Sequence, residues 1–237
     1  MTDWIPPIFI MCNPQQESIR YKFLLEHLPK RGIPLEKVNF VHAEWGSELT
    51  SERVFQAYDP FKVRYGIKTA LCFKAPCLTH GELSLLLTFR KVLEEAWKSG
   101  EPEVVVFESD VCLRDDFLER FKPILVDAAG KSWEYISLGE GAFLRPNGAG
   151  SYFVESKLYP SEGQFVFRCC DSMVFRRSFI GKLLQTFMSG PETPIRECLD
   201  WELNVQMMIH RGVSLWVDPP LVEPGSGRWK VPTSLPS

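Results

Sequence analysis

The chain has 237 residues, of which 45% are hydrophobic and 24% are charged, and its formal net charge at pH 7 is −3. This length and composition predict a single α/β domain with one sizeable core. They exclude a disordered chain and give no general electrostatic reason to bind polyanions, so we expect no nucleic-acid partner.

The N-terminal segment lacks a basic flank, and its short apolar run is interrupted by two prolines, so it matches no secretory signal. Nowhere does the sequence reach the roughly eighteen consecutive apolar residues of a transmembrane helix, and we expect no transmembrane segment. The seven cysteines form an odd set without CxxC pairs, which argues against a zinc ribbon or a complete disulfide framework. A reducing cytoplasm and buried free thiols are the simplest expectation.

The opening of the chain has the pattern of a βαβ unit, for which a parallel strand pair and a right-handed crossover are expected. Its predicted elements are a strand at 8–12, a helix at 17–30 that Gly32 and Pro34 end, and a strand at 38–43. Residues 44–78 have weak periodicity and predict a surface excursion with one short helix near 51–58.

The central segment carries the strongest signals. Thr79 and Glu82 form a capping-box pattern, and apolar residues at three- and four-residue spacing then predict a long amphipathic helix. Ser99-Gly100 ends it. The segment 103–107, in which four apolar residues follow Glu103, predicts a central strand covered on both faces, with Glu108 and Asp110 at its carboxyl end, where open α/β sheets bind ligands.

The remaining sequence predicts an alternation of helices and strands around a glycine-rich break at 139–150. The predicted elements are a helix at 115–127, a strand at 133–138, strands at 151–154 and 164–170, helices at 178–188 and 200–211, and a strand at 213–217. We expect a loop-like tail in which Arg228, Trp229 and Lys230 either close over a diphosphate or form an ordinary surface.

Glu108 and Asp110 are candidate metal ligands. In an extended segment residues two apart project to the same side, so both carboxylates can hold one hard cation such as Mn²⁺ or Mg²⁺. Such a cation stabilises the diphosphate that leaves a nucleotide-sugar donor. The alternative is a solvated strand-end turn with ordinary acidic residues.

The order of motifs favours the ligand interpretation, because it resembles the glycosyltransferase family that includes bacterial lipooligosaccharide galactosyltransferases and procollagen galactosyltransferases. The resemblance rests chiefly on Leu78-Thr-His-Gly-Glu-Leu83 followed by Val104-Val-Val-Phe-Glu-Ser-Asp-Val111. Shorter similar pieces are Ile10-Met-Cys-Asn13 with Arg20, 32–33, 41–43, 133–139, 171–176, Asp200 with Glu202, and 218–222. The chain departs from the family at Ser109, where the family has an acidic residue, at 84–89, and at Gln16 or Glu17, one of which replaces an arginine.

This resemblance implies one GT-A type domain over residues 1–237, with a Rossmann-like, mostly parallel central sheet flanked by helices. It implies a nucleotide-sugar-binding half at 1–138 and an acceptor-side half at 139–237. The implied activity is inverting transfer of a hexose, galactose or glucose, from a UDP-sugar to a glycan or glycolipid acceptor. A binding module that kept the fold and lost catalysis is the alternative, motivated by Ser109 and the altered 84–89 segment.

The resemblance also assigns roles to individual residues. Asp200, or else Glu202, is the implied catalytic base; for Asp200 the competing role is that of a helix N-cap. Donor-binding residues are Asn13, Arg20, Gly81, Glu82, Glu108 and Asp110. Glu82 is equally explained by its capping box, and Arg20 by a solvated helix face.

Overall fold

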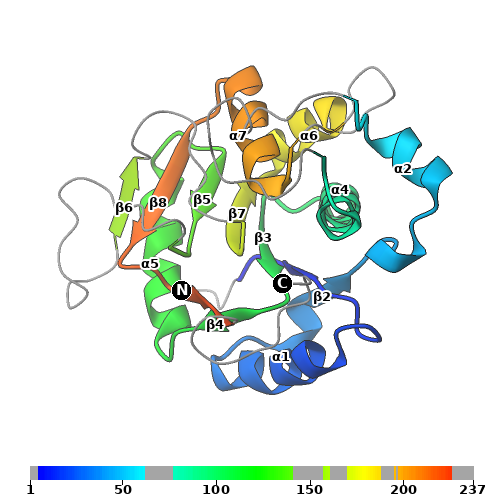
Figure 1. The fold of residues 1–237 in the computed structure, drawn as a ribbon. Coiled ribbons are helices and arrows are strands. Elements are labelled where there is room, and N and C mark those ends of the chain that lie inside the picture. Colours follow the sequence, from blue (N-terminus) through cyan, green and yellow to red (C-terminus); the bar gives the residue numbers. More distant parts are fainter. Residues whose placement is uncertain are drawn as a thin grey trace.

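The computed structural model describes residues 5–61, 77–140, 157–160, 170–187, 195 and 197–225 (Figure 1). The helices are α1 (Ser18–Lys30), α2 (Ser51–Ala57), α4 (His80–Ser99), α5 (Phe117–Ala129), α6 (Arg177–Thr186) and α7 (Leu199–His210), with short 3-10 helices η1 (Leu35–Lys37) and η2 (Gly46–Glu48). The strands are β1 (Ile8–Met11), β2 (Val38–Val41), β3 (Glu103–Glu108), β4 (Val111–Leu113), β5 (Tyr135–Ser137), β6 (Lys157–Pro160), β7 (Ser172–Arg176), β8 (Ser214–Asp218) and β9 (Val222–Pro224).

Seven of the described strands form one mixed, mostly parallel sheet with the order β2-β1-β3-β7-β5-β8-β6. β1 pairs in parallel with both β2 and β3, which confirms the predicted βαβ unit. β7 is antiparallel to β3 and β5, and β6 is antiparallel to β8. Because β7 lies between β3 and β5, the segments before and after residue 139 share one sheet.

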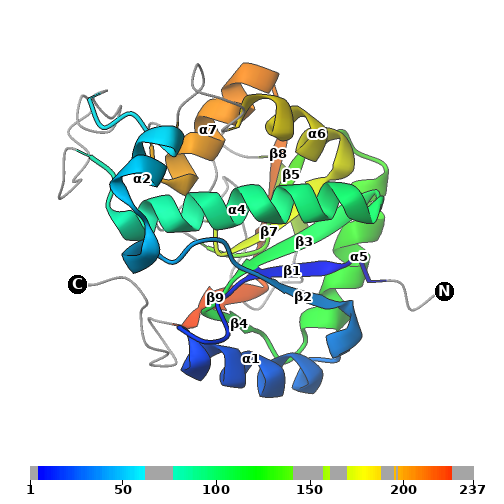
Figure 2. The same ribbon diagram turned by 90° about the vertical axis from the view of Figure 1, so that its right-hand side faces the viewer.

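Helices cover both faces of this sheet (Figures 1 and 2). Alternate side chains of β1 and β3 point to opposite faces, as the period of two in a strand requires. Phe9 and Val106 join a core cluster that contains buried residues of α4, α6 and α7. Ile10 and Phe107 join the other cluster, which contains buried residues of α1 and α5. The structure is therefore a three-layer α/β arrangement, compatible with a Rossmann-like fold.

Local patterns located most elements correctly. The Thr79–Glu82 capping box is present, with the Thr79 amide donating to Glu82 Oε2 at 2.8 Å and the Glu82 amide donating to Thr79 Oγ1 at 3.2 Å. Gly100, with a φ of 76°, ends the helix in the left-handed conformation that glycine adopts without strain.

Several expectations about strands and the tail were wrong or lie outside the described residues. β3 ends at Glu108, and residues 109–110 form a turn, so the extended segment does not run through Asp110. The start of the tail expected to be loop-like, Val222–Pro224, forms β9, because it pairs with the unpredicted strand β4, and residues 226–237 lie outside the described residues. The strand expected at 151–154, nearly all of that expected at 164–170, and Arg228, Trp229 and Lys230 lie outside the described residues.

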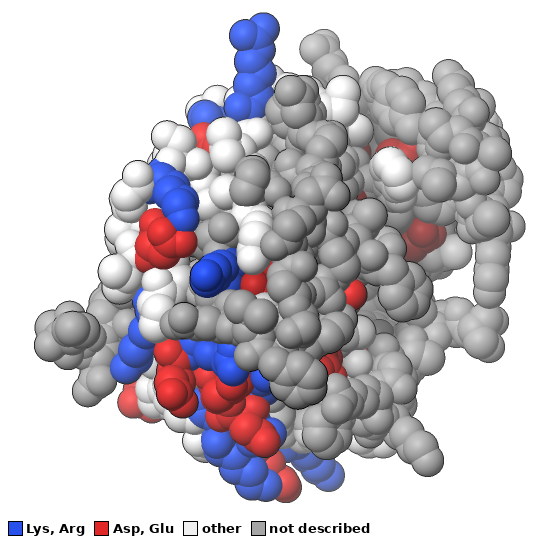
Figure 3. Space-filling model, turned by 90° about the vertical axis from the view of Figure 1, so that its left-hand side faces the viewer, with Lys and Arg blue, Asp and Glu red and all other residues white. Residues whose placement is uncertain are grey.

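Charged side chains of both signs are interspersed on the described part of the face in Figure 3. Elsewhere in the fold, ion pairs connect neighbouring segments of the chain. Arg31, at the end of α1, donates to Asp115 Oδ1 at 2.6 Å and to the Leu113 carbonyl at 3.1 Å. These contacts tie α1 to the segment that enters α5.

Substitution of Phe175 on β7 tests the packing of the core beneath α4 and α6. Its ring is fully buried, with centroids 5.6 Å from Tyr135 and 5.9 Å from Phe89. Phe175→Ala should lower the free energy of unfolding by about 3–5 kcal/mol, measured by denaturant titration, because truncation leaves a cavity. Phe61→Ala, at an 85% exposed ring, should change it by less than about 0.5 kcal/mol. Equal effects of the two substitutions would contradict this description of the core.

Candidate functional site

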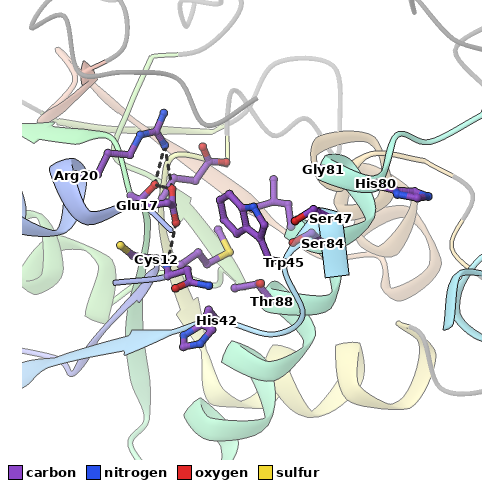
Figure 4. A pocket seen from close by; sticks show the side chains of 16 residues that line it. Cys12, Glu17, Arg20, His42, Trp45, Ser47, His80, Gly81, Ser84 and Thr88 are labelled. Atoms are coloured by element: carbon purple, nitrogen blue, oxygen red, sulfur yellow. Dashed lines mark hydrogen bonds and ion pairs between the residues drawn. The ribbon is translucent and has the colours of Figure 1, made fainter. Parts of the chain in front are cut away.

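A cavity of about 360 Å³ opens at the carboxyl ends of β1, β2 and β3, against the N-terminal half of α4 (Figure 4). This is where parallel strands of an open α/β sheet bind ligands. The register puts Met11 beside both Val41 and Glu108, so the three strands end together. The residues that line the cavity are Met11, Cys12, Asn13, Glu17, Arg20, His42, Trp45, Gly46, Ser47, His80, Gly81, Ser84, Leu85, Thr88, Glu108 and Ser109.

Arg20 is the cation of this cavity wall. It is only 7% exposed, so the alternative of a solvated helix face is wrong. Its Nη1 donates to Ser109 Oγ at 2.7 Å and lies 3.4 Å from Glu17 Oε1, and its Nη2 lies 3.9 Å from Asp110 Oδ2. Three side chains from two segments of the chain therefore hold the guanidinium in place.

Asn13 organises the loop between β1 and α1. Its Oδ1 accepts from the backbone N–H groups of Gln15 at 3.1 Å and Gln16 at 3.3 Å, and its own backbone N–H donates to Glu17 Oε2 at 2.9 Å. The residue lines the cavity. The asparagine thus shapes the loop through its side chain and presents that loop to a ligand.

Glu108 ends β3 at the cavity and is surrounded by other acids. Burial raises the pKa of Glu108 well above its usual range, and the charges of Asp110, Asp200 and Asp171 raise it further, while Arg20 opposes them. Because of the turn after β3, the two predicted ligands have different surroundings. Glu108 lines the cavity, as does Ser109, whereas Asp110 is 8% exposed and lies beside Arg20. The two carboxylates nevertheless remain close enough to interact electrostatically.

Asp200 comes to this acidic cluster from the start of α7. Cys198 is the N-cap of α7, and Asp200 is its second residue, so Asp200 is not the N-cap. Burial raises the pKa of Asp200, while hydrogen bonds from the thiol and the amide of Cys170 lower it. Asp200 is nevertheless exposed to solvent, and this exposure limits how far burial can raise its pKa.

Glu202 has different surroundings from Asp200. Its side chain is 8% exposed and accepts a hydrogen bond from Gln206 Nε2 at 2.9 Å. Gln206 in turn accepts from Thr186 of α6 at 2.6 Å. Glu202 therefore belongs to a polar network between α6 and α7, and unlike Asp200 it is not among the charges that shift the pKa of Glu108.

The start of α4 forms the opposite wall. Gly81 and Ser84 line the cavity, whereas Glu82 is held by its capping box and does not. Gly46 of η2 packs so closely that a Cβ there would lie 3.1 Å from the His80 carbonyl. The Trp45 ring lies between Arg20 and the Ser84 side of α4 (Figure 4).

Sequence reasoning missed three residues of the site: Glu17, Trp45 and Asp171. Asp171 is 2% exposed, and its carbonyl accepts from the Glu108 amide at 2.8 Å. A Cβ on Gly139 would lie 2.5 Å from Asp171 Oδ1, so the glycine permits this close packing. Gly139 is one of several glycines in the break at 139–150, so no local pattern pointed to Asp171, Glu17 or Trp45.

Glu108 and Asp110 have the ligand chemistry of a divalent-cation site whose coordination is completed by a substrate. No group of three or more His, Cys, Asp or Glu side chains within the described residues has the arrangement of a metal site. Mg²⁺ and similar ions are commonly held by one or two carboxylates, with phosphates and water completing the coordination. Glu108 and Asp110 have that chemistry, and a cation would relieve the repulsion that raises the pKa of Glu108.

Comparison with known proteins gives no family assignment. No protein-family model matches the chain, and no curated protein matches it. Among the described residues, no helix combines the length and apolarity that crossing a membrane requires. The geometry of the cavity is therefore the basis for a functional proposal.

Glu108 should make stability depend on pH. Its pKa is raised above 4.5 in the folded state, so its contribution to stability is present below about pH 4.5 and is lost as pH rises through the folded pKa. Relative to the wild type, metal-free Glu108→Gln should become progressively more stable as pH rises from 4 to 8, measured by thermal melting. Exposed Glu119→Gln is the matched control. If the melting temperatures of wild type and Glu108→Gln change with pH in the same way across this range, the raised pKa of Glu108 is refuted.

The thiol of Cys170 should hold down the pKa of Asp200. Because the thiol donates to the ionised carboxylate, Cys170→Ala should raise the pKa of Asp200, and Cys170→Ser, which keeps a donor, should not. Carbon NMR titration of the Asp200 carboxyl measures both. An unchanged titration in the alanine variant would show that the thiol does not act on Asp200.

Proposed function

We propose that this chain is a metal-dependent, inverting glycosyltransferase of the GT-A type. It would transfer a hexose, galactose or glucose, from a UDP-sugar to a glycan or glycolipid acceptor. The observation that carries the proposal is a cavity at the carboxyl ends of β1 and β3 that is lined by the held Arg20 and by Glu108, with Asp110, Asp171 and Asp200 near enough to raise the pKa of Glu108.

The residues that would bind the donor diphosphate come from two walls of the cavity. Arg20 offers a fixed guanidinium, whose planar donors suit phosphate oxygens. Across the cavity, α4 begins at His80 with Gly81 on the wall, and the N-terminus of a helix attracts anions. Both features favour a ligand that carries negative charge along the cavity.

Glu108 and Asp110 would hold Mn²⁺ or Mg²⁺ at the end of β3. When bound, the cation supplies Lewis-acid stabilisation to the departing diphosphate. Glu108 has to give up its proton to serve as a ligand, and its raised pKa means that this step depends on pH. Arg20, beside Asp110, keeps part of the acidic charge balanced before the ligand arrives.

Asp200 would act as the base that accepts the proton of the acceptor hydroxyl. A carboxylate for this task needs solvent or substrate access and a pKa somewhat above its usual range. Asp200 has an exposed surface and a raised pKa, and Cys170 orients its carboxylate. Glu202 is engaged with Gln206, which makes Asp200 the better candidate of the two.

The decisive experiment is binding of nucleotide sugars in the presence of Mn²⁺ or a chelator, followed by thermal melting. UDP-glucose or UDP-galactose at a hundred times its dissociation constant should stabilise the chain by about 2.7 kcal/mol. UDP release on adding a glycan or glycolipid acceptor then separates a transferase from a binding module. If no nucleotide sugar shifts the melting temperature under any metal condition, the proposal is wrong.

Asp110→Asn should remove most of the Mn²⁺-dependent part of that melting shift, because the ion loses one of two carboxylates. We expect at least about a tenfold weaker apparent affinity, which corresponds to about 1.4 kcal/mol. Asp127→Asn, at a half-exposed surface pair with Lys131, is the matched control and should bind as the wild type does. Retention of the full Mn²⁺ effect in Asp110→Asn would exclude this residue as a ligand.

A further inference from the structure

Glu17 is a buried carboxylate that reaches the end of β3 from the start of α1. Its side chain is 7% exposed. Oε2 accepts from the backbone N–H of Asn13 at 2.9 Å, and Oε1 accepts from Ser109 Oγ at 2.6 Å. A carboxylate so buried is costly unless hydrogen bonds and a counter-charge compensate it, and both are present here.

The direction of the hydrogen bonds through Ser109 follows from the chemistry of its partners. A serine hydroxyl has one proton, and an arginine can only donate. Ser109 therefore accepts from Arg20 Nη1 at 2.7 Å and donates its own proton to Glu17 Oε1. Arg20, Ser109 and Glu17 form a directed chain in which the uncharged serine links a cation to an anion.

We propose that Glu17 supplies negative charge to the cation site at the end of β3 and, through Ser109, positions Arg20 there. This inference rests on the proposed function, in which Glu108 and Asp110 hold the cation. Ser109 lies between those two residues in the sequence, and Arg20 contacts Ser109, Glu17 and Asp110 together. Glu17 thus acts from outside the predicted ligand pair, as a positioning and charge-balancing residue.

The electrostatic consequence has a definite sign. A negative charge within several ångströms of a divalent cation favours its binding, and partial burial weakens the screening by water. Removing the Glu17 charge also leaves Arg20 less balanced, so its repulsion of a nearby cation grows. Both effects weaken cation binding in a Glu17→Gln variant.

Four proteins test this inference: the wild type, Glu17→Gln, Ser109→Asp and the double variant Glu17→Gln/Ser109→Asp. Glu26→Gln on the same helix, with a 77% exposed carboxylate, is the matched control. Two quantities are measured for each protein. One is the melting temperature without ligand, and the other is the Mn²⁺ concentration at half-saturation in the presence of UDP, well below every melting temperature.

We expect Glu17→Gln to raise the Mn²⁺ half-saturation concentration about tenfold, and Glu26→Gln to leave it unchanged. Ser109→Asp should melt lower than the wild type, because it adds a second carboxylate where Ser109 Oγ lies 2.6 Å from Glu17. The double variant has one carboxylate in this position again. It should melt higher than Ser109→Asp and bind Mn²⁺ within about threefold of the wild type, a coupling that independent sites do not show.

Two outcomes overturn the inference. One is a Glu17→Gln variant that binds Mn²⁺ as the wild type does, even if it melts lower, because Glu17 would then be only a structural contact. The other is a double variant that recovers neither melting temperature nor Mn²⁺ affinity. If the wild type itself responds to neither UDP nor Mn²⁺, the proposed function and the inference both fail, whereas a responsive wild type with an unaffected Glu17→Gln removes the inference alone.

Discussion

The parallel pairing of β1 with β3 is the contact on which the site depends. It aligns Met11 with Glu108, so the loop that follows β1 and the turn that follows β3 leave the sheet side by side. Arg20 can then reach Ser109, which is 89 residues away in sequence, with a 2.7 Å hydrogen bond. A shift of one residue in this register would turn Glu108 to the opposite face of the sheet and separate it from the cavity.

The charges at this edge are unevenly balanced. Arg20 is shared among Ser109, Glu17 and Asp110, while Glu108 meets the repulsion of Asp110, Asp171 and Asp200. The protein tolerates this arrangement by keeping Glu108 protonated to a higher pH than usual. In the proposed function, this excess of acidic groups over cations is what would favour a bound cation. The same imbalance is a reason to interpret the acids as functional, since perturbed pKa values gather at functional sites.

Elements with strong local signals were predictable from the sequence, and those defined by distant pairing were not. The capping box at Thr79 and the apolar run before Glu108 specify α4 and β3 locally. The ribbon of β4 and β9 forms because segments about a hundred residues apart meet, and short strands carry little pattern of their own. The same limit applies to the site. Glu17 is an ordinary helix-start residue until Ser109, 92 residues later, lies against it.

Ser109 shows how a residue that looks unfavourable for a cation site in the sequence is interpreted differently once its neighbours in the fold are known. In the sequence it stands between two acids, and an uncharged residue there weakens the expectation of a cation. In the fold, its hydroxyl donates to the buried Glu17 carboxylate and accepts from one nitrogen of Arg20, so an acidic side chain lies beside Ser109. The cost of a missing carboxylate is therefore set by the neighbourhood of the residue and not by its type alone. Whether a cation binds at the end of β3 depends on the total charge that Glu17, Glu108, Asp110 and Arg20 bring together.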